Sequence, residues 1–326
     1  MNRRTSLQLA AGSLAMGLTS SAANNITLAV ESTTPQEKSV EFTFTEAAKS
    51  ISFCLNTSTI HGENIPVTEQ IKIASKAGYT GIELWVRDVE KYITSGNKLS
   101  VLRRQIADAG LQVQSAIAFG EWIVDDEAAR KKGLEQCGKD METIRELGGR
   151  RIAAPPTGAT KQAGLDLDRA GERYRELIEV GRARDVVPQL EVWGFSKNLH
   201  RLSQVLYVCA AAQHPDACIL PDIYHLFKGG SDFSDAHLLP GSRVHVLHMN
   251  DYPADPPRET ISDQHRVYPG DGVAPIRYAL QAMMRNGFAG VLSLELFNRD
   301  YWNQDPNIVA ATGLAKMKAS VADAIV

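Results

Sequence analysis

Four residues that could bind a metal ion or transfer a proton lie near the ends of four apolar runs of this sequence. They are Glu191, Asp222, His248 and Glu295. A charged side chain next to an apolar core is unfavourable unless it has a partner or binds a metal ion. In a parallel barrel the C-terminal ends of the strands converge on one face, where active sites lie. The leading interpretation is therefore that the four side chains share one divalent metal ion.

This donor set combines three carboxylates with one imidazole, which suits Mn, Mg, Co or Zn. A single acidic residue at a strand end is often only a solvated carboxylate on the rim, but three carboxylates and a histidine at equivalent places are hard to explain by coincidence. A six-coordinate ion would leave positions open for substrate oxygens. A carboxylate bound through one oxygen keeps a free oxygen that can carry a proton. The set therefore predicts proton transfer beside one divalent ion.

The elements that must position these residues alternate between strand-like and helical patterns. The strand-like runs cover residues 51–54, 81–85, 111–119, 151–155, 189–193, 218–222, 244–248 and 291–295. Between them, apolar residues spaced three and four apart predict helices, as at Val67, Ile71 and Ala74 before Gly78. Such glycines suit a left-handed end of a helix. Leu314 begins the pattern of a final helix that runs to residue 325.

This alternation predicts an α/β fold. Strands that alternate with helices pair in parallel, and eight such units predict a closed (β/α)8 TIM barrel. An open doubly wound sheet is the alternative, but no glycine-rich phosphate loop follows the first strand. Because no linker or shift in composition divides the chain, we expect a single catalytic domain over residues 49–326.

Composition narrows the possible functions. An apolar fraction of 44% suits a globular enzyme with a sizeable core. The formal net charge is -3 and no basic block is present, so a nucleic-acid partner is not expected. The four cysteines contain no CxxC pair and are too few for a disulfide scaffold.

The N-terminus has the pattern of an export signal. Arg3 and Arg4 precede a mildly apolar stretch over residues 6–18, and small residues follow up to Ala23. The paired arginines resemble a twin-arginine signal. The apolar stretch is too short and too rich in Gly and Ala to span a membrane. We therefore predict a signal over residues 1–23, a polar lead-in over 24–48, no membrane span, and an exported, periplasmic protein.

The motifs around the four candidate ligands resemble the xylose isomerase-like TIM barrel superfamily. They lie in residues 220–225, which read Leu-Pro-Asp-Ile-Tyr-His, in 246–251 and in 263–272, together with the Leu-Glu pairs that contain Glu191 and Glu295. Within the superfamily the chain is most similar to the sugar phosphate isomerase/epimerase group, which is related to ketose 3-epimerases and inosose dehydratases. The resemblance covers residues 50–326.

The resemblance implies a role for each of the four residues. Glu191, Asp222, His248 and Glu295 would be the metal ligands. Glu191 and Glu295 would also be the acid–base pair, placed on opposite faces of the substrate carbon. The expected activity is that of a divalent-metal-dependent isomerase or epimerase, which acts on a sugar or keto-sugar through an enediolate.

Five further residues are candidates for substrate binding. By the resemblance, His225 would bind a substrate oxygen and Arg266 would reach other substrate oxygens. Trp85 and Trp193 could form apolar walls under a sugar ring, although ordinary barrel packing would explain them equally well. Lys197 stands where the related ketose epimerases have a carboxylate, six residues after the first metal glutamate. A lysine there could protonate a leaving hydroxyl or bind an acid group.

Other functions remain open at this stage. A lyase could use the same enolate and then expel a hydroxyl or alkoxide, as an inosose or keto-sugar dehydratase or a keto-glycoside cleaving enzyme would. A non-catalytic sugar-binding barrel is disfavoured by intact Glu191 and Glu295. Apurinic-site endonucleases share the barrel and the Asp263-Gln264-His265 pattern, but they need further histidines after the second and third strands. Whether Asp263 and His265 bind a second metal ion is left open.

Export also bears on the substrate. An exported enzyme would rarely meet a phosphorylated sugar, so we expect a small free sugar, keto-sugar or cyclitol. A homodimer is possible.

Overall fold

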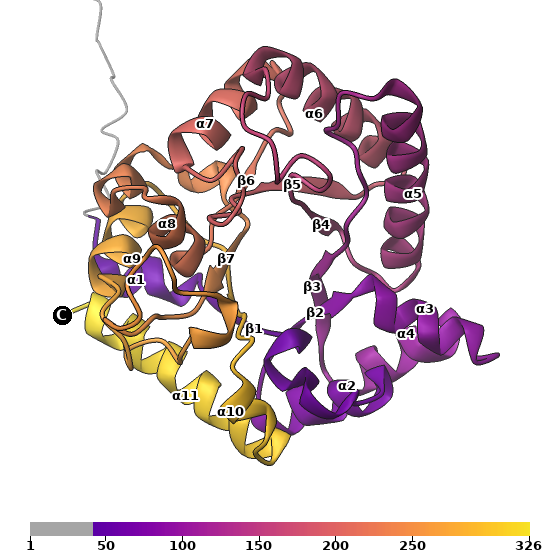
Figure 1. Cartoon of the computed structure of the whole chain (residues 1–326). Coiled ribbons are helices and arrows are strands. Elements are labelled where there is room, and N and C mark those ends of the chain that lie inside the picture. The colour runs from indigo at the N-terminus through magenta and orange to yellow at the C-terminus, as the bar shows by residue number, and fades with distance from the viewer. Residues whose placement is uncertain (1–41) are drawn as a thin grey trace, which may run out of the picture. The chain divides into compact units, whose positions relative to one another are not determined.

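Eight short parallel strands surround the centre of the structure, and helices surround the strands (Figure 1). The computed structural model describes residues 42–326. The strands are β1 (Ser52–Asn56), β2 (Gly81–Trp85), β3 (Gln112–Ile117), β4 (Arg151–Ala154), β5 (Val187–Glu191), β6 (Ile219–Leu220), β7 (Val246–Met249) and β8 (Val291–Leu294). β1 pairs in parallel with both β2 and β8, which joins the first strand to the last. The predicted TIM barrel is therefore confirmed.

The helices alternate with the strands as the spacing of apolar residues predicts. They are α1 (Phe44–Lys49), α2 (Val67–Ala77), α3 (Val86–Thr94), α4 (Leu99–Asp108), α5 (Glu127–Glu146), α6 (Leu167–Arg182), α7 (Leu202–Ala211), α8 (Ile223–Gly229), α9 (Ile276–Arg285), α10 (Arg299–Trp302) and α11 (Pro306–Ala324). α2 ends at Gly78, whose φ of 91° is left-handed as expected. α11 begins at Pro306 rather than at Leu314. Asp305 accepts a hydrogen bond from the N–H of Asn307 and so starts the helix earlier.

Side chains along each strand alternate between the barrel interior and the layer that faces the helices. In β2, Ile82 and Leu84 belong to the large apolar core, whereas Trp85 belongs to a second, smaller cluster of inward-facing residues. That inner cluster contains Cys54, Trp85, Ile117, Ala153, Leu220, Val246 and Val291. Glu83 shares the inward side of β2 with Trp85 and is fully buried.

In the described part of the chain, residues 42–326, one helix precedes the first strand of the barrel. α1 has Thr43 as its cap and packs against α9, and the guanidinium of Arg285 lies 5.0 Å from the centre of the Phe44 ring. The predicted export signal over residues 1–23 lies outside the described residues. Within residues 42–326, no helix is long and apolar enough to cross a membrane.

Candidate metal and acid–base site

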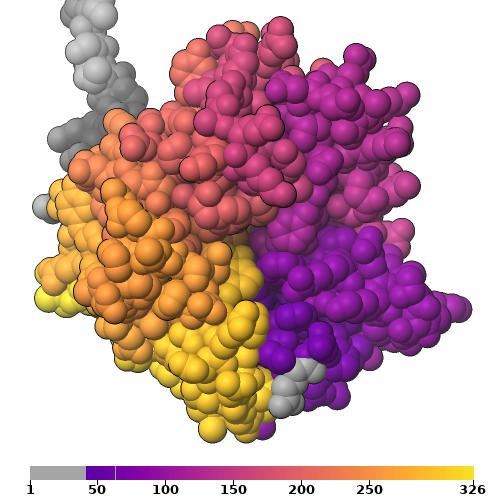
Figure 2. All heavy atoms as spheres, viewed as in Figure 1, coloured from indigo at the N-terminus to yellow at the C-terminus, as the bar shows by residue number. Residues whose placement is uncertain are grey.

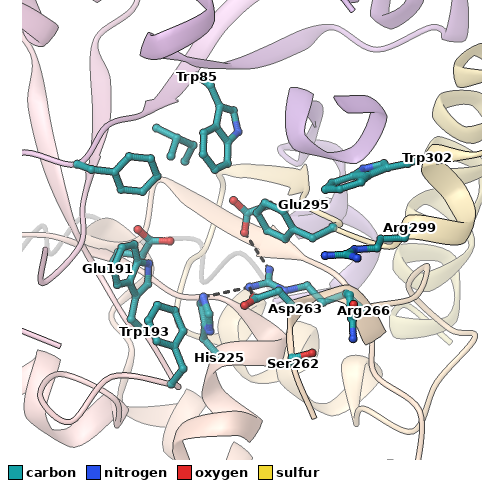
Figure 3. A pocket seen from close by; sticks show the side chains of 15 residues that line it. Trp85, Glu191, Trp193, His225, Ser262, Asp263, Arg266, Glu295, Arg299 and Trp302 are labelled. Atoms are coloured by element: carbon teal, nitrogen blue, oxygen red, sulfur yellow. Dashed lines mark hydrogen bonds and ion pairs between the residues drawn. The ribbon is translucent and has the colours of Figure 1, made fainter. Parts of the chain in front are cut away.

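The four residues predicted from the strand ends meet at one point inside the barrel. His248 Nδ1 lies 3.3 Å from Glu295 Oε2, and 3.7 Å from both Glu191 Oε1 and Asp222 Oδ2. All four residues are buried. Glu191 and Glu295 also line an open cavity, and Figure 3 shows both carboxylates pointing into it. The cluster therefore lies at the floor of a cavity that a small molecule can enter.

The strands place these four side chains at a similar height along the barrel axis, near the C-terminal ends of β5 to β8. Glu191 ends β5, His248 lies within β7, and Glu295 directly follows β8. Asp222 follows β6 and forms a parallel bridge to His248. Asp222 is also the N-cap of α8, because its Oδ1 accepts a hydrogen bond of 2.7 Å from the N–H of His225. Asp222 therefore starts α8 with Oδ1 and directs Oδ2 toward His248.

A fifth carboxylate, Glu83 on β2, lies behind His248. Its Oε2 is 3.1 Å from His248 Nε2 and also accepts hydrogen bonds from Ser293 Oγ at 2.7 Å and Asn56 Nδ2 at 2.9 Å. Burial raises the pKa of Glu83, but the charge and hydrogen bond of His248 outweigh burial and hold the pKa below its usual value. An ionised Glu83 can only accept, so Nε2 carries a proton and Nδ1 is left facing the other carboxylates.

These residues fit a divalent cation. His248 Nδ1 is buried and has no hydrogen-bond partner within the described chain. Donor atoms of Glu191, His248 and Glu295 all lie within 4.8 Å of one another. A histidine whose other ring nitrogen is held by a carboxylate is the usual arrangement of a metal-binding imidazole. Burial alone would lower the pKa of His248. The charges of Glu295 and Glu83 outweigh burial and raise this pKa well above its usual value. The carboxylates therefore favour a positive charge at this place.

Asp222 lies beside this group of three but is held by other partners. Its Oδ2 accepts from Arg266 Nη1 at 2.8 Å and from Asn250 Nδ2 at 3.0 Å. Arg266 Nη1 also donates to Glu295 Oε2 at 2.9 Å, so the guanidinium bridges these two carboxylates. The structure brings Asp222 close to His248, and its second oxygen is shared with a buried arginine.

Arg266 and His225 form the polar side of the site. Arg266 Nη2 lies 3.0 Å from His225 Nε2 and 2.6 Å from Asp263 Oδ1. A guanidinium only donates, so His225 Nε2 accepts and its proton lies on Nδ1. That Nδ1 has no partner within the described chain, and His225 lines the cavity. His225 therefore presents its ring to the cavity, while its Nδ1 is enclosed by the protein.

The two glutamates have environments that separate their pKa values. Burial raises the pKa of Glu191 well above its usual range, and Glu295 and Asp222 add to this effect against the opposing influence of His248. Burial also raises the pKa of Glu295, but His248 and Arg266 outweigh burial and hold that pKa below its usual value. Glu191 is therefore the better proton donor, and Glu295 is the better base.

The cavity has a volume of about 520 Å³ and opens at the C-terminal ends of the strands. Figure 2 shows the surface hollowed near the middle of this face. Trp85, Trp193, His225 and Arg266, which the sequence indicated, all line it. Lys197 is exposed and is not among the lining residues.

A tight turn in the loop after β5 determines where Lys197 lies. The N–H of Ser196 donates to the carbonyl of Trp193, and the N–H of Lys197 donates to the carbonyl of Thr160. The loop folds back at this turn, so a residue six positions after Glu191 does not reach the cavity.

Asp263 and His265 do not form a second metal cluster. Asp263 is bound by Arg266, whereas His265 Nδ1 lies 3.0 Å from Ser262 Oγ. Among residues 42–326, the group of three or more metal donors contains neither of them. The positive charge beside Asp263 is therefore that of Arg266 and not that of a second metal ion.

Several functional residues were not identified from the sequence. Glu83 and Asn56 hold His248 and Glu295, and Phe119 and Phe195 line the cavity. Glu83 had a detectable signal, because it is a carboxylate in the middle of the apolar run 81–85. The two phenylalanines come from loops, where a single sequence gives no comparable signal.

The sequence profile of the family described as "Xylose isomerase-like TIM barrel" matches residues 71–319. An inosose isomerase from Halalkalibacterium halodurans is 25% identical over 253 residues, which are 76% of this chain and 89% of that protein. A 3-dehydroshikimate dehydratase from Pseudomonas putida is 24% identical over 254 residues, which are 76% of this chain but 39% of that protein. The crystal structure of IOLI protein with a zinc atom bound has a TM-score of 0.77 at 21% identity, and the match covers 83% of this chain and 98% of that one.

Proposed function

Because the chain belongs to the xylose isomerase-like TIM barrel family, we propose that it is a divalent-metal-dependent isomerase or epimerase of a sugar, keto-sugar or cyclitol. One observation carries the proposal. Glu191 and Glu295 come from β5 and from the end of β8, face a single cavity, and lie 3.7 Å and 3.3 Å from the same nitrogen of His248. A pair of this kind can remove a proton from one face of a carbon and return one to the other face.

We assign the cation to Glu191, His248 and Glu295, with Asp222 as the fourth ligand. When bound, a divalent cation polarises a substrate carbonyl and lowers the cost of removing the proton from the adjacent carbon. The relative with a bound zinc atom supports such a site in this fold, and Mn, Mg, Co and Zn all suit the donor set. Glu83 and Asn56 keep His248 and Glu295 in place from behind.

The residues of the chain then have separate tasks. Glu295 takes the proton, since Asn56 and Arg266 hold its carboxylate in one orientation. Glu191 supplies a proton from another side of the cavity. We assign the substrate oxygens to the polar side of the cavity, which His225 and Arg266 form, and the aromatic side limits the access of water.

Proton exchange with solvent tests this proposal directly. Purified protein loaded in turn with Mn, Mg, Co or Zn is incubated in deuterium oxide with free ketoses, keto-sugars and inososes. We expect deuterium at the carbon next to the carbonyl and a product whose mass, apart from deuterium, equals that of the substrate. If none of the metal-loaded forms exchanges this proton on any member of the panel, the proposal is wrong.

A lyase remains the second candidate. Glu191 could protonate a leaving hydroxyl or alkoxide instead of a carbon, since its carboxyl group faces the cavity. The relation to a dehydratase supports this possibility. Loss of water, or release of an aglycone, in the mass spectrum would identify this reaction.

We also propose that the protein is exported to the periplasm. The proposal depends on Arg3, Arg4 and the apolar stretch that follows them.

A further inference from the structure

One side of the cavity is a continuous row of aromatic rings. Consecutive ring centres are 6.0 Å apart for Phe297 and Trp85, 5.4 Å for Trp85 and Phe119, 6.0 Å for Phe119 and Trp193, and 5.0 Å for Trp193 and Phe195. We call these five side chains the aromatic wall. All five line the same cavity as Glu191 and Glu295. The wall thus runs from the acid–base pair toward the opening.

The polar residues of the cavity include His225, Asp263 and Arg266, which are joined by hydrogen bonds. They meet the aromatic wall only at its two ends, where His225 lies 5.7 Å from Phe195 and the Arg266 guanidinium lies 5.1 Å from the Phe297 ring. Figure 3 shows Trp85 and His225 on different sides of the two glutamates. A ligand in this cavity therefore meets hydrogen-bonding groups on one side and flat apolar surfaces on the other.

The outer rings of the wall are unusually exposed for their type. Phe119 is 43% exposed and Phe195 is 47% exposed, whereas Trp85 is only 7% exposed. Exposed aromatic side chains that extend a cavity are typical of a binding surface. Since Phe119 and Phe195 lie outside the floor of the cavity, they are placed to contact a part of a ligand beyond the ring that reacts.

The inner end of the wall is held rigidly. Trp85 Nε1 donates to Asn56 Oδ1 at 2.9 Å, and the guanidinium of Arg87 lies 4.1 Å from the centre of the Trp85 ring. Asn56 in turn donates to Glu295 Oε1 at 3.1 Å. The orientation of the wall is therefore fixed by the same network that positions the proposed base, which favours binding without rearrangement.

From these observations we infer that the substrate carries a planar apolar substituent, as an aryl glycoside of a keto-sugar does. The inference depends on the proposed function for the reacting end of the ligand. One sugar ring stacks its C–H face on one or two aromatic rings, and Trp85 and Trp193 are sufficient for that purpose. Phe119 and Phe195 extend the apolar surface further, and their rings suit the flat face of an aromatic aglycone.

Binding of matched glycosides tests the inference independently of turnover. The probes are the phenyl and methyl glycosides of the same 3-keto-hexose, titrated calorimetrically into the full-length protein loaded with manganese. We expect the phenyl compound to bind about tenfold more tightly, which corresponds to one well-placed aromatic contact. Equal affinities for the two compounds would overturn the inference.

Variants of the aromatic wall show whether the ligand stacks on the rings or only needs an apolar surface. Phe119→Leu and Phe195→Leu keep an apolar side chain but remove the ring, and we expect most of the preference for the phenyl glycoside to be lost in the double variant. Tyr278→Leu is the control, because Tyr278 is an exposed ring on α9 outside the cavity. If the double variant keeps the full preference, the aromatic wall is not the binding surface.

Failure of the two proposals can be told apart. Proton exchange on free keto-sugars without a preference for the phenyl glycoside would leave the proposed function intact and refute the aryl substituent. A preference that depends on Phe119 and Phe195 but is accompanied by no proton exchange would support the wall as a ligand site and refute the isomerase.

Discussion

Glu83 Oε2 and His248 Nε2 lie 3.1 Å apart in the interior of the barrel, with both side chains inaccessible to solvent. This contact decides which nitrogen of His248 carries the proton and directs Nδ1 toward Glu191, Asp222 and Glu295. Glu83 therefore acts as a positioning residue. It contacts neither the cavity nor the proposed ion, yet the geometry of the cluster depends on it.

Glu83→Gln tests this role. We expect the affinity for a divalent metal to fall by about 10- to 100-fold, because the amide no longer fixes the tautomer and the orientation of His248. Affinity is measured by titration with manganese or zinc, and circular dichroism establishes that the variant is folded. Tyr79→Phe is a suitable control, since the buried Tyr79 hydroxyl donates to the carbonyl of Ala310 and not to His248. Unchanged metal affinity in Glu83→Gln would show that the contact is only structural.

Glu295→Gln separates proton transfer from metal binding. An amide oxygen can still coordinate weakly, so we expect part of the metal to be retained. An amide cannot accept the substrate proton, so turnover and deuterium incorporation should fall by about 10² to 10⁴. Metal content and exchange are measured on the same sample. Exchange at the wild-type rate would mean that Glu295 is a ligand and that another group is the base.

The barrel could be predicted because the sequence repeats one unit eight times. Runs such as 81–85 and 291–295 have the length of a strand, and glycines such as Gly78 and Gly287 end the helices between them. Four site residues could be found because each is a charged or polar group at the end of an apolar run. Glu83 was missed because it lies in the middle of its run, although the same argument about buried charge applies there.

Features that depend on loops could not be predicted in this way. The position of Lys197 follows from a turn between Trp193 and Ser196, and the spacing from Glu191 gave no sign of that turn. Phe119 and Trp193 are far apart in the sequence, and their rings meet only because the loops after β3 and β5 lie over the same opening. Such contacts are set by the closure of the barrel rather than by local pattern.

His225→Ala should weaken substrate binding and leave the metal in place. His225 lines the cavity and holds Arg266 through Nε2, so its removal loosens the polar side of the site and raises KM roughly tenfold. Metal content should be unchanged, because His225 is outside the group formed by Glu191, His248 and Glu295. His265→Ala is the matched control, since that ring is turned toward Ser262. Loss of metal in His225→Ala would make it a ligand instead.

Export can be tested without any knowledge of the substrate. Replacing Arg3 and Arg4 by lysine keeps the charge but removes the paired arginines that a twin-arginine route requires. We expect the variant to accumulate in the cytoplasm, and the mature wild-type protein to begin after residue 23. Cell fractionation and N-terminal sequencing measure both outcomes. Normal export of the variant would exclude the twin-arginine route, and an intact N-terminus on wild-type protein from the cell envelope would exclude cleavage.

Asp140 should make the stability of the fold depend on pH. It lies buried on α5, where Gln136 Nε2 donates to its Oδ1 at 2.7 Å. Burial raises the pKa of Asp140 to about 6, against the lowering effect of Gln136. The folded state therefore favours the protonated acid. The stability that this group contributes is fully present below the pKa of the unfolded chain, about 3.9, and is lost as the pH rises through 6.

Asp140→Asn should remove this dependence. After allowance for screening by solvent, we expect the variant to be more stable than the wild type by about 1 kcal/mol at pH 8, or roughly 2 °C in Tm. The difference should shrink as the pH falls toward 4, because Asp140 is then protonated in the folded state and increasingly protonated in the unfolded chain. Thermal unfolding of both proteins between pH 4 and 8 gives the measurement, and the exposed Asp108→Asn is the control. A difference in Tm that stays constant across this range would show that the titration of Asp140 is not coupled to folding.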